Sequence, residues 1–173
     1  MAPSGPVSAV IVRFRLPTGL EQIRRLHDPA ASMGVPAHVT LLYPFLPVPQ
    51  LTLGVRRSLV DIAGGTNPFD VRFRRIDRFP AAVYLAPDRP APFVRLTGLI
   101  AECFPGYPPY GGAFEAVVPH LTLSPSDASF AAMTATAERF LPFTRRASSL
   151  EILAQDDGGR WRLRWRIPFG VRR

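Results

Sequence analysis

The same order of predicted elements occurs twice along the chain, and this repeat constrains the fold more than any other feature of the sequence. Each half is predicted to run strand, helix, strand, helix, strand, with a junction near Pro80. Runs rich in β-branched residues predict the strands, and apolar residues three or four positions apart predict the helices. The strands are expected at 8–16, 37–45, 69–79, 81–87, 120–124 and 143–155, and the helices at 18–28, 50–65, 91–104 and 126–141. Such a repeat predicts two similar lobes related by a pseudo-two-fold axis.

The composition predicts a folded protein of ordinary domain size. Of the 173 residues, 47% are hydrophobic and 20% are charged, which is typical of a folded domain rather than a disordered segment. We expect a single domain over 1–173, with lobe-forming halves at roughly 1–79 and 80–173 and with strands that can be exchanged between the lobes. No apolar run has the length of a membrane span, no secretory signal is evident, and a single cysteine excludes an internal disulfide. These features predict a cytoplasmic monomer with no membrane contact and no protein partner.

The basic residues are all arginine, and they outnumber the acidic residues by 21 to 13, which gives a net charge of +8. The planar guanidinium group suits phosphate recognition, and a basic surface favours anionic partners such as nucleotides or RNA. A GC-rich genome explains the preference for arginine over lysine equally well, but it does not explain the excess of positive charge.

A hairpin is predicted near the C-terminus, where the sequence Asp-Asp-Gly-Gly at 156–159 separates two strand-like runs. Because side chains alternate across a strand, a regular second strand has one basic face and one apolar face. The basic face consists of Arg160, Arg162, Arg164 and Arg166, and the apolar face of Trp161, Leu163, Trp165 and Ile167. A solvated basic face is the simpler interpretation, and an RNA-facing surface is the alternative.

The pattern His, apolar, Thr, apolar occurs at His38 and again at His120, although the chain has only three histidines. Residues two positions apart in a strand point to the same face, so His38 points with Thr40, and His120 points with Thr122. The apolar residues between them then point into a core. If the lobes are related by two-fold symmetry, the two His–Thr pairs face each other across one groove.

Two histidines on one groove can divide acid–base work. An imidazole titrates near pH 6.5, so one ring can act as a general base while the other acts as a general acid. In the cleavage of a phosphodiester, the base takes a proton from the attacking oxygen and the acid gives one to the leaving oxygen. Threonine hydroxyls can donate hydrogen bonds to the non-bridging phosphate oxygens, where charge develops. This chemistry requires no metal and no other cofactor.

Other interpretations of these residues remain open. His38 and His120 could be satisfied structural residues, or they could belong to a metal site, although no third ligand lies near either motif at the usual spacing. His27 lies near the end of a predicted helix, where the helix dipole favours a cation, so we interpret it as structural. Cys103 lies on the apolar stripe of the predicted helix 91–104 and is expected to be buried.

The sequence resembles the two-histidine (2H) phosphoesterases, in the branch related to bacterial 2′-5′ RNA ligases and cyclic phosphodiesterases. The specific part of the resemblance is the pair of motifs HVTLLYPF and PHLTLS. Softer matches are RFPAAVYLAPD, FPGYPPYGG and DDGGRWRLRWRIPFG, so the resemblance covers most of the chain. It implies an α+β fold with two pseudo-symmetric antiparallel-sheet lobes, outer helices and a central groove.

The resemblance also implies the activity and the site. It predicts a metal-independent phosphodiesterase that acts on 2′,3′-cyclic or 2′-5′-linked phosphodiesters, with His38 and His120 as the catalytic pair. Thr40 and Thr122 become the phosphate ligands. The sequence departs from several RNA-ligase-like relatives, which carry an arginine shortly after the second motif, because none occurs here before Arg139.

Five further residues are candidates for substrate binding. Ser124 is on the same strand face as His120 and can add a hydroxyl, and Arg78 lies near the junction of the halves, where it can meet a phosphate. Tyr84 can line the groove. Tyr107 and Tyr110 lie in a turn-rich loop before His120, where they can stack on a base or pack the loop against its lobe.

Two classes of function follow from these observations. The first is an enzyme that cleaves or transfers RNA-type phosphodiesters, and the second is a non-catalytic module that binds RNA or nucleotides on the same fold. The two intact motifs favour the enzyme.

Overall fold

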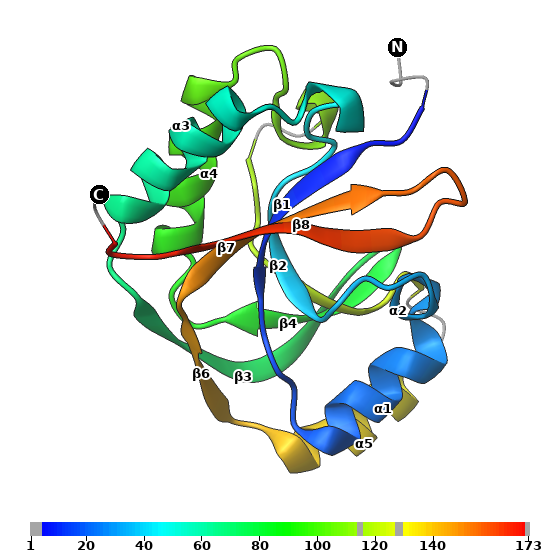
Figure 1. Cartoon of the computed structure of the whole chain (residues 1–173). Coiled ribbons are helices and arrows are strands. Elements are labelled where there is room, and N and C mark those ends of the chain that lie inside the picture. Colours follow the sequence, from blue (N-terminus) through cyan, green and yellow to red (C-terminus); the bar gives the residue numbers. More distant parts are fainter. Residues whose placement is uncertain (1–4, 114–115, 127–129, 172–173) are drawn as a thin grey trace.

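The computed structural model describes residues 5–113, 116–126 and 130–171, which form two four-stranded antiparallel sheets and the helices that cover them (Figure 1). The first sheet has the strand order β2-β1-β7-β8, and the second has the order β5-β4-β3-β6. The strands are β1 (Ser8–Arg13), β2 (His38–Leu42), β3 (Phe69–Phe79), β4 (Ala82–Pro87), β5 (Leu121–Ser124), β6 (Phe143–Ala147), β7 (Ser149–Gln155) and β8 (Trp161–Pro168). The expected α+β fold with two antiparallel-sheet lobes is confirmed.

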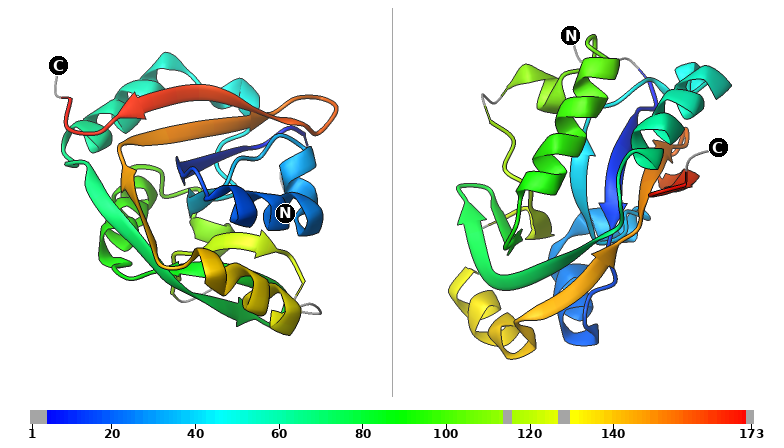
Figure 2. Two further views of the ribbon diagram at one scale, coloured as in Figure 1. Left: turned by 90° about the horizontal axis from the view of Figure 1, so that it is seen from below. Right: turned by 90° about the vertical axis from the view of Figure 1, so that its left-hand side faces the viewer.

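Apart from the short α2, the helices of the described residues pack in two pairs, one on each sheet. They are α1 (Thr18–His27), α2 (Pro29–Ser32), α3 (Leu53–Gly64), α4 (Ala91–Cys103) and α5 (Phe130–Ala137), with short 3₁₀ segments at Val48–Gln50, Pro109–Gly112 and Glu138–Phe140. Helices α3 and α4 pack on the first sheet, and α1 and α5 pack on the second. Figure 2 shows the two pairs at opposite ends of the molecule.

The predicted strand 143–155 is in fact two strands in different sheets. β6 pairs with β3 in the second sheet, whereas β7 pairs with β1 in the first. The chain passes between the sheets at Ser148, whose carbonyl accepts a hydrogen bond from Phe169 N at 2.9 Å. The continuous β pattern could not reveal this crossing, because both strands alternate in the same way.

One continuous hydrophobic core connects the two sheets. Phe14, which follows β1, packs edge-on against Phe73 of the second sheet at 5.4 Å between ring centroids and against Phe93 of α4 at 6.3 Å. Apolar side chains of β2 and β5 enter the same core. The two edge strands that carry the His–Thr motifs are therefore fixed to one rigid body of side chains.

The expected regular alternation of β8 is wrong, because the strand contains a bulge. Ile152 lies opposite Trp165, but the next residue, Leu153, lies opposite Leu163, so Arg164 is an extra residue. Trp165 therefore packs on the main core, while Leu163 is 47% exposed and shares a face with Leu153. The arginines and apolar residues of this strand do not separate onto two faces.

Cys103 is exposed, which contradicts its expected burial. It is the last residue of α4, where the helix leaves the sheet. Within the described residues, every helix is too short or too polar to span a lipid bilayer.

Candidate active site

The first His–Thr motif forms β2, the edge strand of the first sheet. Val39 and Leu41 are buried in the core, so the alternation of the strand points His38 and Thr40 to the opposite face. The buried hydroxyl of Thr97 on α4 donates a 3.0 Å hydrogen bond to the Leu41 carbonyl. This contact fixes the strand from behind.

The second motif repeats this arrangement at the edge of the second sheet. Leu121 and Leu123 of β5 are buried, while Thr122 lies opposite Tyr84 of β4 and shares its face. His120 directly precedes the strand and contacts the Tyr84 ring edge-on, with ring centroids 5.4 Å apart.

Both imidazoles are anchored in the same way. His38 Nδ1 lies 2.7 Å from the carbonyl oxygen of Pro36, and His120 Nδ1 lies 2.7 Å from that of Val118, in each case two residues earlier. A carbonyl oxygen only accepts, so Nδ1 must carry the proton in both rings. In the neutral form, Nε2 is then the basic atom of each histidine.

A chain of hydrogen bonds surrounds His38. Its Nε2 lies 3.0 Å from Thr40 Oγ1 and, being the acceptor, receives the threonine proton. The side chains of Tyr110 and Thr40 are also hydrogen-bonded. Tyr110, Thr40, His38 and the Pro36 carbonyl thus form one polar chain that aims Nε2.

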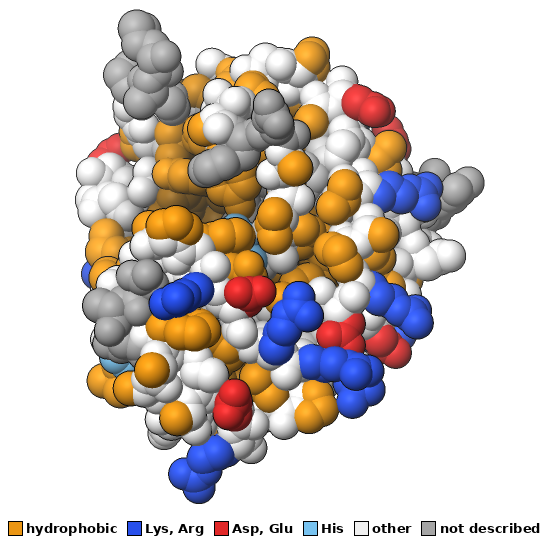
Figure 3. Space-filling view, turned by 180° about the vertical axis from the view of Figure 1, so that it is seen from behind, with side chains coloured by type: hydrophobic (Ala, Val, Ile, Leu, Met, Phe, Trp, Pro, Cys, Tyr) orange, Lys and Arg blue, Asp and Glu red, His pale blue; other side chains and the backbone are white. Residues whose placement is uncertain are grey.

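The two motifs lie side by side. Strands β2 and β5 are in contact across the sheets, and the charge of His120 is one of the causes that lower the pKa of His38. Figure 3 shows histidine side chains in a hollow of the molecular surface, with apolar side chains around them.

The surroundings of the two histidines shift their acidity to different degrees. Burial, together with the nearby charge of Arg24, lowers the pKa of His38 from 6.5 to about 4, against the opposing hydrogen bond to Pro36. Burial also lowers the pKa of His120, against its hydrogen bond to Val118. Both rings are therefore disposed to be neutral in the free protein.

Aromatic side chains form the wall beside His120, and one of them was missed in the sequence. The Phe79 and Tyr84 rings stack at 4.3 Å between centroids, and Phe79 meets the His120 ring edge-on at 5.2 Å. Tyr84, a candidate from the sequence, thus lies beside the site. Phe79 was missed because a register shift between Phe73 and Arg75 reverses which residues of β3 face the core.

The three other candidates from the sequence, Arg78, Tyr107 and Ser124, make contacts with residues other than the two His–Thr pairs. The Arg78 guanidinium lies over the Phe130 ring at 4.8 Å from its centroid, on the face of β3 that α5 covers. Tyr107 packs on the core and donates a 2.9 Å hydrogen bond to Gln50. Of the two interpretations of this tyrosine, it therefore has the one in which it packs the loop against its lobe. Ser124 is buried, and its hydroxyl donates to the Ser126 carbonyl at 3.0 Å.

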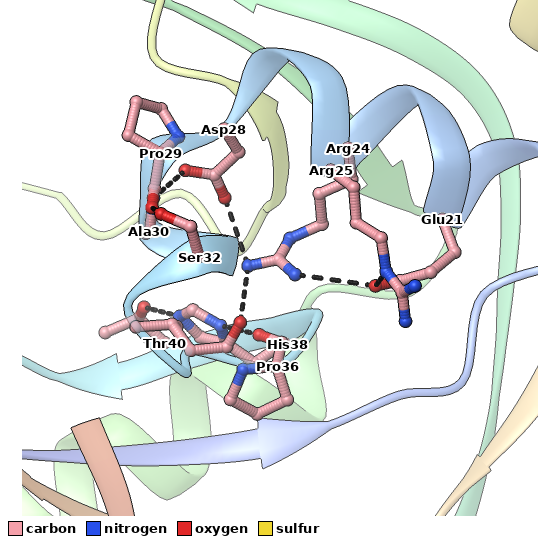
Figure 4. Close-up of polar contacts among 11 residues, drawn as sticks. Glu21, Arg24, Arg25, Asp28, Pro29, Ala30, Ser32, Pro36, His38 and Thr40 are labelled. Atoms are coloured by element: carbon pink, nitrogen blue, oxygen red, sulfur yellow. Dashed lines mark hydrogen bonds and ion pairs between the residues drawn. The ribbon is translucent and has the colours of Figure 1, made fainter. Parts of the chain in front are cut away.

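A buried arginine behind His38 gave no signal in the sequence. Arg24 of α1 is 2% exposed, and its guanidinium lies 3.1 Å from Asp28 Oδ2 and 3.8 Å from Glu21 Oε1 (Figure 4). It also donates a 2.8 Å hydrogen bond to the carbonyl of Val35, the residue before Pro36. Arg24 thereby ties α1 to the turn that anchors the His38 ring.

No metal centre is evident in residues 5–113, 116–126 and 130–171, where no three His, Cys, Asp or Glu side chains are grouped as ligands. The polar groups of the site are instead two imidazoles, two threonine hydroxyls and a tyrosine hydroxyl. Such groups can move protons and donate hydrogen bonds to an anionic oxygen.

Comparisons with known proteins agree with this geometry. The sequence profile of the 2′-5′ RNA ligase superfamily matches residues 12–159. No curated protein shows significant sequence similarity to the chain.

Solved structures share the fold at low sequence identity. The protein TT0787 of Thermus thermophilus has a TM-score of 0.59 at 16% identity, over 96% of this chain and 100% of its own. E. coli LigT in complex with 3′-AMP has a TM-score of 0.54 at 18% identity, over 95% and 99% of the two chains. Usb1 of Kluyveromyces marxianus has a TM-score of 0.51 at 13% identity, over 94% and 98%. The resemblance expected from the two motifs is confirmed, and the chain belongs to the 2′-5′ RNA ligase superfamily of two-histidine phosphoesterases.

Proposed function

We propose that the protein is a metal-independent phosphodiesterase that acts on RNA-type phosphodiesters, either 2′,3′-cyclic phosphates or 2′-5′ linkages. The observation that carries the proposal is the matched anchoring of two histidines. Two adjacent edge strands each present an imidazole whose Nδ1 is bound to a backbone carbonyl and whose Nε2 is the basic atom. The matched threonines lie beside them.

His38 is assigned as the general base. Its low pKa keeps the ring neutral over most of the pH range, and Nε2 already accepts a proton in a hydrogen bond from Thr40. In the hydrolysis of a 2′,3′-cyclic phosphate, Nε2 takes a proton from water as the water oxygen bonds to phosphorus. The Thr40 hydroxyl then turns to a non-bridging phosphate oxygen.

His120 is assigned as the general acid. As the ring P–O bond breaks, protonated Nε2 of His120 gives its proton to the departing ribose oxygen. Thr122 and Thr40 donate hydrogen bonds to the non-bridging oxygens, where negative charge develops. The bound phosphate is an anion, so its charge favours the protonated form of His120 that this step requires.

The surrounding residues suggest how a nucleotide is held. The Phe79–Tyr84 stack beside His120 offers a flat surface for a base, because aromatic rings bind bases by stacking. The complex of E. coli LigT with 3′-AMP supports a nucleotide or RNA substrate for this chain. A role in RNA processing in the cytoplasm, as a monomer, is part of the same proposal.

The experiment measures hydrolysis of nucleoside 2′,3′-cyclic phosphates in the presence of EDTA. The wild-type protein should turn over the substrate, and His38→Ala and His120→Ala should each lower kcat by about 10²–10⁴-fold. His27→Ala is the matched control, because His27 is the third histidine and is exposed at the end of α1. Tight binding without turnover would indicate a non-catalytic module, and activity restored only by added metal would refute the proposed mechanism.

A further inference from the structure

An arginine-lined groove runs along the end of β1, apart from the two histidines. It consists of adjoining hollows of about 720 and 340 Å³ that share Arg13, Arg15 and Glu151. We define the arginine groove by the guanidinium groups of Arg13, Arg15, Arg25, Arg145, Arg146 and Arg166. The residues come from four elements or their flanking turns, so the fold gathers this charge.

Three of these arginines retain an uncompensated charge. Within the described residues, Arg13, Arg15 and Arg145 have no carboxylate within ion-pair distance. Arg145 is held by neutral groups instead, because its Nε donates to the Arg15 carbonyl at 2.7 Å and its guanidinium lies 5.2 Å from the centre of the Phe143 ring. Its position is fixed without neutralising its charge.

The carboxylates of the groove are already engaged by other arginines. Glu151 is 3% exposed and accepts a 2.7 Å hydrogen bond from Arg166 Nε, while Glu21 lies 3.4 Å from Arg25 Nε. The net charge that faces the groove is therefore positive. Such a surface favours an anionic occupant.

The groove adjoins the candidate active site through β1. Arg13 lies directly opposite His38 in the pairing of β1 with β2, so their side chains share one face of the sheet. Pro36 and Ala37, the two residues before His38, also line the groove. Arg166 on β8 lies three strands from His38, which is about 15 Å at the usual spacing of strands.

We propose that the arginine groove binds the phosphate backbone of a single-stranded RNA whose reacting phosphodiester lies between His38 and His120. About four nucleotides cover 15 Å at the 3.4 Å rise of a stacked strand, so a mononucleotide cannot extend along the groove to Arg166 and an oligonucleotide can. This inference rests on the proposed function for the identity of the reacting group. It adds that the preferred substrate is a polynucleotide.

A nucleic acid fits the groove better than an acidic protein segment does. Guanidinium groups bind phosphates through two parallel hydrogen bonds, as Arg13 and Arg15 can. Arg145 already donates from Nε and Nη1 to the carbonyls of Arg15 and Thr144, so it contributes mainly its charge. Of the large apolar side chains that line the groove, Leu163 is the one that is strongly exposed. Protein interfaces generally bury a larger apolar centre.

The test measures binding of a fluorescent single-stranded dodecanucleotide RNA with a 3′-phosphate, by anisotropy, at salt concentrations from 50 to 200 mM. The variant is Arg13→Gln, Arg15→Gln and Arg145→Gln combined. Three lost phosphate contacts should lower the slope of log affinity against log salt by about 2, and affinity at low salt should fall about tenfold or more. Turnover of a nucleoside 2′,3′-cyclic phosphate should be unchanged in the pair Arg15→Gln and Arg145→Gln, which keeps Arg13, the residue opposite His38, in place.

The matched control is Arg57→Gln, Arg89→Gln and Arg95→Gln, which removes the same charge from exposed arginines on or next to α3 and α4. If loss of the Arg145 contacts impairs folding, the double variant Arg13→Gln, Arg15→Gln replaces the triple variant in the binding assay. The proposal would be overturned if the variant and the control lost RNA affinity equally, or if the variant bound the RNA as tightly as the wild-type protein does. It would also be overturned if a polyglutamate peptide displaced the RNA as well as unlabelled RNA does. Absence of mononucleotide turnover in the wild-type protein would count against the proposed function, while the binding comparison would still decide the groove.

Discussion

Removal of the Arg24 side chain should destabilise the protein strongly and also disturb His38. The guanidinium is 2% exposed and is shared by Asp28, Glu21 and the Val35 carbonyl. In Arg24→Met, the carboxylate of Asp28, which is itself buried, keeps only its bond from Ala30 N at 3.0 Å. An uncompensated buried charge of this kind costs about 3–5 kcal/mol of unfolding free energy.

The size of this loss can be checked by thermal and urea unfolding. For a protein of this length, each kcal/mol corresponds to a change in Tm of about 2–4 °C, so Tm should fall by roughly 6–20 °C. The double variant Arg24→Met, Asp28→Asn removes the buried charge, while the Asn side-chain oxygen still accepts the bond from Ala30 N. It should therefore recover a large part of the lost stability, as a double-mutant cycle measures.

The catalytic effect separates this residue from a purely structural one. Thr97→Val is the matched control, because Thr97 is also buried and also bonds to the backbone next to the site, at Leu41 rather than Val35. The charge of Arg24 is one of the causes that lower the pKa of His38, so Arg24→Met should raise that pKa and move the acid limb of the pH–rate profile to higher pH. Thr97→Val should leave the limb in place. A loss below about 1 kcal/mol in Arg24→Met, or a double variant no more stable than Arg24→Met, would refute the argument from a buried ion pair.

Three other predictions follow from the two motifs. Thr40→Ala and Thr122→Ala should each lower kcat on a cyclic phosphate by about 10–100-fold and preserve a bell-shaped pH profile, since each removes one hydrogen bond to developing charge; an unchanged kcat would exclude a phosphate ligand. The pH profile of kcat/KM should have an acid limb near pH 4 from His38 and a basic limb below pH 6.5 from His120, and His120→Ala should abolish the basic limb; limbs that stay in place in both His variants would belong to other groups. The folded protein should lose stability as pH falls from 6.5 to 4, because the unfolded state binds a proton at His38 that the folded state resists. The loss from this group should be at most about 3 kcal/mol. In His38→Gln, the free energy of unfolding from urea titrations should fall less steeply with pH over this range.

The sequence was most informative where regular alternation persists. The segments 38–40 and 120–122 keep the period-two alternation, and the pairing irregularities of both strands come only after Thr40 and Thr122, so the direction of all four motif side chains followed from spacing alone. The positions of Phe79 and Leu163 could not be predicted in this way. Each lies beyond an irregularity of pairing, and such irregularities reverse the faces without changing the composition of the strand.

Arg24 illustrates a different limit of sequence analysis. With Glu21 three residues before it and Asp28 four residues after it, the sequence has the pattern of ordinary surface ion pairs on a helix. The guanidinium is buried because the chain returns after α2 and places the Val35 carbonyl against it. A contact between residues 11 positions apart that depends on a non-repetitive turn has no periodic signal.

The pseudo-symmetry of the fold and the asymmetry of the side chains have separate consequences for the chemistry. Symmetry places two imidazoles at adjacent sheet edges with the same anchoring, which supplies two equivalent proton carriers. Two equivalent groups share a single proton equally near their common pKa, so equivalence alone does not fix which ring is the acid and which is the base. The surroundings remove this equivalence: a buried arginine and a polar chain lie beside His38, whereas the stacked rings of Phe79 and Tyr84 lie beside His120. In the proposed mechanism, residues outside the repeated motifs therefore decide which histidine gives a proton and which one takes it.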